Sequence, residues 1–183
     1  MKEYVRAKSN SMKKINDLTL PGEIVIFGST YMAGFPIYEL VNKYSFENAV
    51  YNRSINGLTI EDALEIVENC VIDIRPSKIF LSLGEEDTDV TNATEKYARL
   101  VTKILSELPD CELYLIGLTG NAPFIETFNQ SIMELCDGKR VKYVNFISNN
   151  LPETALYKAR FRQLSSFFRN RQMTMYDAFR TVE

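Results

Sequence analysis

The chain has 183 residues, 45% of them hydrophobic and 25% charged, with 21 Lys and Arg against 24 Asp and Glu. This length suits one domain that buries roughly 70% of its unfolded surface, and the charge balance argues against a general nucleic-acid or membrane-surface binder, which would carry a basic excess. The sequence contains no His, which excludes Ser-His-Asp, Cys-His and His-metal chemistry.

The N-terminal segment, residues 1–20, is polar and basic, and we expect it to form an extra helix. It lacks the continuous apolar core of a signal peptide, and no apolar run approaches the ~20 residues that span a bilayer. The three cysteines are dispersed and odd in number, which favours buried, reduced thiols over a disulfide set or a zinc site. We therefore expect a cytoplasmic protein with no membrane partner.

Five short runs rich in β-branched and aromatic residues are predicted as strands, namely 24–27, 49–52, 78–83, 112–116 and 141–147. Their nearly continuous apolar character suits a sheet covered on both faces. Apolar residues repeat at helical spacing over 60–71 and 97–108, and Thr59 with Asp62 predicts a capping box before the first of these helices. The alternation predicts a single three-layer α/β domain, residues 1–183, that ends in a helical segment over 151–183.

Ligands of such sheets bind beyond the carboxyl ends of the strands. Three turns at these positions carry recognisable blocks: Ile26-Phe27-Gly28-Ser29-Thr30, Asn52-Arg53-Ser54-Ile55-Asn56-Gly57 and Leu83-Gly84-Glu85-Glu86-Asp87. Together and in this order they resemble the SGNH/GDSL lipase and acylhydrolase superfamily, in particular its platelet-activating-factor acetylhydrolase-like branch. The resemblance covers residues 15–147. It implies a flavodoxin-like sandwich with a five-stranded parallel sheet of order 2-1-3-4-5.

The resemblance also assigns roles to individual positions. The family's nucleophilic Ser corresponds to Thr30, and the Asp before it corresponds to Ser29. One oxyanion donor, the backbone N–H of a Gly, is retained as Gly57, while the family's second donor, an Asn, corresponds to Glu86. The family's Asp-x-x-His has no counterpart. The remaining residues that the resemblance places in the pocket are Gly28, Asn56, Gly84, Glu85 and Asp87.

Each departure opposes ester hydrolysis. An alcohol needs an adjacent base to attack, and loss of that base costs several powers of ten in rate in dissected triads. A donor to the oxyanion is worth ~3 kcal/mol, whereas an ionised carboxylate at 4 Å repels it by roughly 1 to 4 kcal/mol. Burial beside Glu85 and Asp87 could instead protonate Glu86 and make it a donor, although no ordinary general base would follow from that.

The acids Glu85, Glu86, Asp87 and Asp89 lie within five residues. They suit a hard cation such as Ca²⁺ or Mg²⁺, but acids are also favoured at the start of a helix, and their spacing matches no EF-hand loop. We favour the helix-start interpretation, and we expect no metal site and no cofactor.

The segment from Tyr157 to Gln172 carries five basic residues and no acid, with Phe161, Leu164, Phe167 and Phe168 at helical spacing. It is predicted as an amphipathic helix that covers the sheet and exposes a basic face. The alternative is a docking surface for an acidic partner or nucleic acid. We also hypothesise that Arg169 or Arg171 pairs with Glu86 or its neighbours and fills the former active site.

These observations predict a degenerate, esterase-like protein that keeps the fold for ligand binding or protein interaction. Its partner would be a small molecule in the former active-site cleft, without nucleic acid. One alternative is a weak carboxylester hydrolase that uses Thr30 or Ser29. Another is an oligomerisation or scaffold module, since the sequence is compatible with a homo-oligomer.

Overall fold

The computed structural model describes residues 1–87, 89–148 and 150–168. Its centre is a parallel sheet of order β2-β1-β3-β4-β5, as predicted. The strands are β1 (Ile24–Gly28), β2 (Val50–Asn52), β3 (Lys78–Ser82), β4 (Glu112–Ile116) and β5 (Val141–Val144).

Strand β5 ends earlier than predicted because side chains of the following helix bind the next backbone groups. Gln163 donates to the carbonyl of Asn145 and accepts from the N–H of Ile147, while Arg160 donates to the carbonyl of Ile147. These backbone groups are therefore satisfied without a neighbouring strand.

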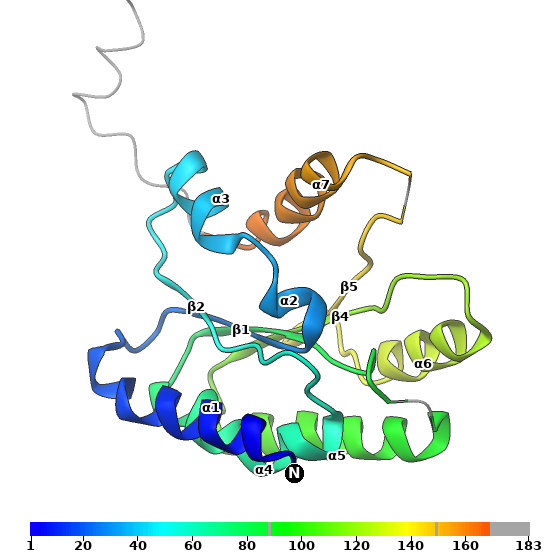
Figure 1. Ribbon diagram of the computed structural model, residues 1–183, viewed down its shortest axis with the longest axis horizontal. Helices are drawn as coiled ribbons and strands as arrows, with labels where there is room; N and C mark the ends of the chain where they lie inside the picture. The colour runs from blue at the N-terminus through cyan, green and yellow to red at the C-terminus, as the bar shows by residue number, and fades with distance from the viewer. Residues whose placement is uncertain (88, 149, 169–183) are drawn as a thin grey trace, which may run out of the picture.

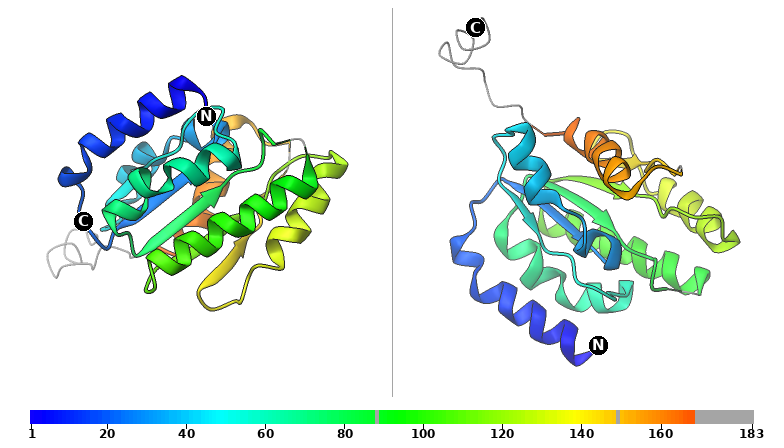
Figure 2. Two further views of the ribbon diagram at one scale, coloured as in Figure 1. Left: turned by 90° about the horizontal axis from the view of Figure 1, so that it is seen from below. Right: turned by 45° about the horizontal axis from the view of Figure 1, so that its top comes forward.

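Helices cover both faces of the sheet, as Figures 1 and 2 show. One face carries α1 (Glu3–Lys14), α4 (Ile60–Cys70), α5 (Val90–Glu107) and α6 (Pro123–Met133), and the other carries α2 (Thr30–Ala33), α3 (Ile37–Tyr44) and α7 (Glu153–Ser165). Two short 3₁₀ helices, η1 (Asn16–Leu18) and η2 (Ile72–Ile74), lie in connections. The chain thus forms the expected α/β/α sandwich.

The side chains of the apolar strands belong to two separate cores, because successive side chains of a strand point to opposite faces of the sheet. In β1, Val25 and Phe27 pack under α4 and α5, whereas Ile24 and Ile26 pack under α3 and α7. The same alternation recurs in β3 and β4, where Phe80 and Tyr114 stack with ring centroids 4.7 Å apart. Burial on both faces explains why these strands read as continuous apolar runs.

The start of α4 confirms the Thr59 cap, since its hydroxyl accepts from the N–H of Asp62 at 3.2 Å. The Asp62 carboxylate lies 3.5 Å from the N-terminal amine of Met1 instead of closing the predicted box. This ion pair fastens the start of α1 to α4.

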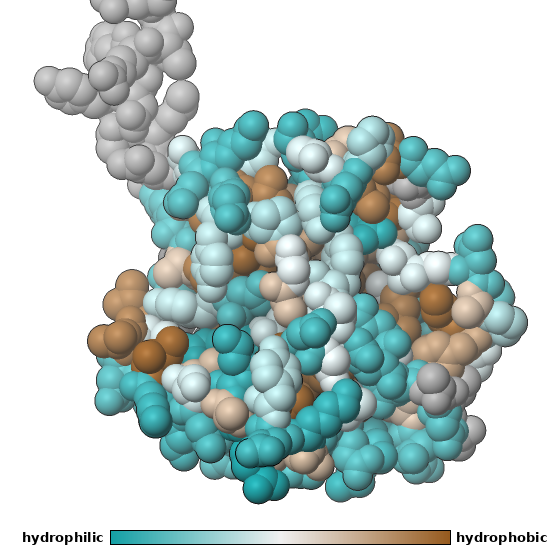
Figure 3. All heavy atoms as spheres, viewed as in Figure 1, coloured by the Kyte–Doolittle hydropathy of each residue, from teal (hydrophilic) through white to brown (hydrophobic). Residues whose placement is uncertain are grey.

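The surface in Figure 3 is mostly hydrophilic, with hydrophobic side chains gathered beside the connection between α1 and β1. Leu18 and Leu20 in that connection are exposed. No helix among the described residues combines the length and apolar character needed to cross a membrane. The three cysteines are free, and burial raises the pKa of the Cys111 thiol to about 12, which keeps that thiol protonated and unreactive.

Candidate functional site

Two glycines shape the turns that follow β1 and β3. A Cβ at Gly28 would lie 2.6 Å from the carbonyl oxygen of Ser82, so only glycine permits this close approach of the two strands. Gly84 has φ +116°, and a Cβ there would lie 2.6 Å from the Phe128 ring. Both glycines therefore position the site without contributing functional groups to it.

Thr30 connects all three sequence blocks through its hydroxyl. Its Oγ1 donates to Glu86 Oε1 at 2.6 Å and accepts from the backbone N–H of Gly57 at 2.9 Å. The structure thus brings together the nucleophile position and the two oxyanion-donor positions named from the sequence. The Gly57 N–H is already used by Thr30, and Glu86 places a carboxylate at the position that the resemblance assigned to the second oxyanion donor.

The exposure of Ser29 and Glu86 bears on two alternatives, namely Ser29 as the nucleophile and a protonated Glu86 as an oxyanion donor. Ser29 is fully buried, and its hydroxyl forms no hydrogen bond with a described residue. The hydroxyl lies beside Glu85, where, against the larger raising effect of burial, it favours the charged form of that carboxyl and so lowers its pKa. A hydroxyl at this depth is shielded from an ester in the cleft. Glu86 is exposed, whereas the protonated-donor alternative requires it to be buried.

The four clustered acids have separate partners rather than a common centre. Glu85 accepts from the N–H of Tyr31, Asp87 accepts from the N–H of Ile60, and Asp89 caps α5 by accepting from the N–H of Asn92. The helix-start interpretation is therefore confirmed for Asp89. Within the described parts of the chain, no cluster of Cys, Asp and Glu is arranged to hold a metal ion.

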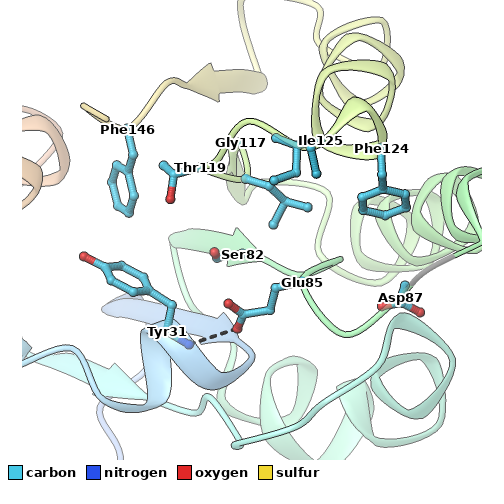
Figure 4. A pocket seen from close by; sticks show the side chains of 11 residues that line it. Tyr31, Ser82, Glu85, Asp87, Gly117, Thr119, Phe124, Ile125 and Phe146 are labelled. Atoms are coloured by element: carbon cyan, nitrogen blue, oxygen red, sulfur yellow. Dashed lines mark hydrogen bonds between the residues drawn. The ribbon is translucent and has the colours of Figure 1, made fainter. Parts of the chain in front are cut away.

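A cavity of about 480 Å³ opens beside this network, at the carboxyl ends of β1, β3, β4 and β5. Figure 4 shows Tyr31 facing Phe146 at one end, Glu85 and Ser82 along one side, and Phe124 and Ile125 across from them. The remaining lining residues are Asp87, Gly117, Leu118, Thr119 and Ala122. Aromatic and aliphatic walls with a few polar groups are typical of small-molecule sites.

Burial raises the pKa of both carboxyl groups in this cavity. Glu85 keeps contact with solvent, but the protein around it desolvates the carboxyl, and the neighbouring Glu86 charge raises its pKa further. Desolvation also raises the pKa of Asp87. Neither group forms an ion pair with a described residue, so their charges are uncompensated at close range.

An arginine does lie at the edge of the cavity, but it is Arg160 of α7. Its guanidinium carbon is 4.7 Å from the Tyr31 ring centroid and 5.4 Å from that of Phe146, and Nη2 donates to Thr119 Oγ1 at 3.3 Å. Arg160 is only 5% exposed, which corrects the expectation that the basic residues of this segment lie on a solvated face. The position is stabilised by the Ile147 carbonyl and by cation–π contact.

The proposed pairing of Arg169 or Arg171 with Glu86 falls outside the described residues. Among described residues, Thr30 is the hydrogen-bond partner of Glu86, and no arginine forms an ion pair with Glu85, Glu86 or Asp87.

A second cavity, of about 500 Å³, lies on the other side of Thr30. Its lining includes Asn56 from the second block, Tyr4 and Lys8 from α1, and Tyr38 from α3. The pocket residues named from the sequence are thus divided, with Glu85 and Asp87 in the first cavity and Asn56 in the second.

The sequence reasoning missed one wall of the first cavity, which is formed by Thr119, Phe124, Ile125 and Phe146. These residues follow β4 and β5, whose turns match no family block. The signal that could have located them is general, because every parallel strand delivers its following turn to the same edge of the sheet. Arg160 had a signal too, since it lies four residues before Leu164 on the apolar stripe of α7.

The fold is shared with several solved structures. A candidate platelet activating factor protein from Streptococcus pneumonia is 17% identical, with 90% of this chain and 92% of that chain covered and a TM-score of 0.78. A GDSL-like lipase from Bacteroides thetaiotaomicron is 12% identical, with coverage of 87% and 98% and a TM-score of 0.68. The lipase/acylhydrolase from Enterococcus faecalis is 16% identical, with coverage of 83% and 100% and a TM-score of 0.65.

These similarities show that the chain has the fold of the SGNH/GDSL lipases and acylhydrolases. No protein-family model matches the sequence, and no curated protein matches it. Because fold alone does not establish function, the chemistry has to be argued from the site.

Proposed function

We propose that this protein has an esterase-like fold without ester hydrolysis and uses its cleft to bind a small ligand. The observation that carries the proposal is the Thr30 network. The single hydroxyl at the nucleophile position donates to a carboxylate and accepts from the Gly57 N–H. In that arrangement the oxyanion donor is occupied before substrate arrives.

Electrostatics supports the same conclusion. Attack by Thr30 would place a developing oxyanion within a few ångströms of Glu86, because Glu86 Oε1 is only 2.6 Å from the attacking oxygen. Repulsion between two such charges amounts to roughly 1 to 4 kcal/mol at 4 Å, depending on the local dielectric. An active hydrolase gains transition-state stabilisation at this position.

One observation favours the alternative of a weak hydrolase. The short hydrogen bond from Thr30 to Glu86 has the geometry of a nucleophile and its general base. A carboxylate is in general a much weaker base than the imidazole of a His. This candidate therefore predicts slow turnover that depends on both Thr30 and the Glu86 charge.

The oligomerisation alternative rests on the C-terminal segment. Phe161 and Leu164 of α7 are buried against the rest of the domain, so their apolar surface is not exposed to a second copy of the chain. Residues 169–183 of this segment lie outside the described part of the chain.

Hydrolysis of 4-nitrophenyl acetate separates the first two functions. For the full chain, Thr30→Ala and Glu86→Gln, we expect the same rate as for buffer alone. A wild-type rate well above background that is abolished by Thr30→Ala and lowered by Glu86→Gln would show that the protein is a hydrolase. Ser29→Ala serves as the matched hydroxyl deletion at the neighbouring buried position.

A further inference from the structure

The cavity beside Thr30 is acidic on one side and apolar on the other. Glu85 and Asp87 line it directly, and Phe124 and Ile125 lie across from them. Its volume of about 480 Å³ lies within the range of small-molecule sites, roughly 300 to 1,000 Å³.

Two cationic side chains lie near the cavity, and each already has partners in the protein. Lys96, whose charge influences Asp87, forms an ion pair with Glu61. Arg160 donates to the Ile147 carbonyl and to Thr119, and the cavity lining among described residues does not include it. The described lining of the cavity therefore contains two carboxylates and no cation.

Ser82 provides an independent indication that the cavity takes a ligand. It is the last residue of β3, and only 9% of it is exposed. Its hydroxyl has no hydrogen-bond partner among the described residues, and Figure 4 shows it directed into the cavity next to Glu85. A hydroxyl that borders a cavity and lacks a protein partner is satisfied by water or by a bound molecule.

We propose that this cavity binds an amphipathic organic cation, with its ammonium group against Glu85 and Ser82 and its apolar body against Phe124 and Ile125. An ammonium donates hydrogen bonds to the carboxylate and to the Ser82 oxygen, and it compensates the charge of Glu85. The Asp87 carboxylate adds negative potential at the same side. A bare metal ion fits less well, because the carboxylates have separate partners and the side chains of Phe124 and Ile125 across from them are apolar.

This inference rests on the proposed ligand-binding function, and three matched probes test it. The probes are 3-phenylpropylamine, 3-phenylpropanol and 3-phenylpropionate, which share one carbon skeleton and carry positive, zero and negative charge. Their affinities for the full-length protein are measured by calorimetry or by NMR titration. We expect the amine to bind roughly tenfold more tightly than the alcohol, and the carboxylate to bind most weakly.

Two variants locate the source of this preference. Glu85→Gln keeps an oxygen that can accept from Tyr31 but removes the charge, so we expect it to bind the amine and the alcohol equally. Glu107→Gln makes the same change at a cavity beyond the opposite ends of the strands, and we expect it to keep the amine preference.

Equal affinities in the wild-type protein, a preference for the carboxylate, or an amine preference that survives Glu85→Gln would each overturn the cation assignment. Binding of the alcohol or carboxylate in such a case would still support the proposed binding role. Binding of none of the three probes would overturn the cation assignment as well. Ester turnover is measured separately and decides the non-hydrolytic part of the proposal.

Discussion

At the scale of single residues, Glu85 is a partly desolvated carboxyl in the cavity where we propose that a ligand binds. Desolvation raises its pKa, so the folded protein holds the carboxyl proton more tightly than the unfolded chain does. The folded state therefore loses stability as the pH rises from the unfolded value, about 4.3, through the raised folded value. At neutral pH the ionised carboxyl destabilises the fold.

This linkage predicts that Glu85→Gln has a larger free energy of unfolding than the wild type near pH 7.5, and that the difference disappears below about pH 4. Urea unfolding at several pH values measures it. Glu61→Gln is the contrasting variant, because a hydrogen bond from Lys96 lowers the pKa of Glu61. The wild type should be more stable than Glu61→Gln at neutral pH and lose that advantage on acidification. A Glu85→Gln protein less stable than the wild type at pH 7.5 would contradict the assigned burial effect.

At the scale of elements, α7 buries an apolar face that its sequence pattern predicts and an arginine that the pattern does not predict. The pattern predicted a helix with an apolar face and a basic face, and Phe161, Leu164 and Phe168 are buried as expected. The inward position of Arg160 depends on tertiary partners, namely the Tyr31 and Phe146 rings and the Ile147 carbonyl. Helical spacing alone does not reveal such partners, because long basic side chains can also extend to solvent.

Arg160 should therefore contribute strongly to stability. Arg160→Ala leaves the Ile147 carbonyl without its donor and opens space between two rings, so we expect a loss of about 2 to 4 kcal/mol in the free energy of unfolding. Arg162→Ala removes an exposed arginine from the same helix, and we expect a change within about 0.5 kcal/mol. Urea denaturation compares the two, and equal effects would show that Arg160 has no special structural role.

At the scale of the whole molecule, the strand order could be predicted from the family resemblance. The convergence of the three blocks could be predicted because parallel strands end at one edge of the sheet. The joining of Thr30, Gly57 and Glu86 follows from that topology. The opposite wall of the cavity could not be predicted in the same detail. Phe124 and Phe146 lie in segments without a motif, and their positions depend on how α6 and the segment after β5 pack.

The arrangement also gives the missing His a structural context. The Thr30 hydroxyl is bonded both to the Glu86 carboxylate and to the Gly57 N–H, and Arg160 is buried beside the cavity. Under the proposed function, these features agree with one another in disfavouring acyl transfer. They leave a partly apolar cavity available for binding.

The most direct test of this account asks whether Thr30 is an activated nucleophile. The full chain is incubated with a fluorophosphonate, which modifies activated hydroxyl nucleophiles without requiring a known substrate, and its intact mass is then measured. We predict an unchanged mass under conditions that fully label an active serine hydrolase. A one-to-one adduct that maps to Thr30, and is absent from Thr30→Ala, would contradict the account.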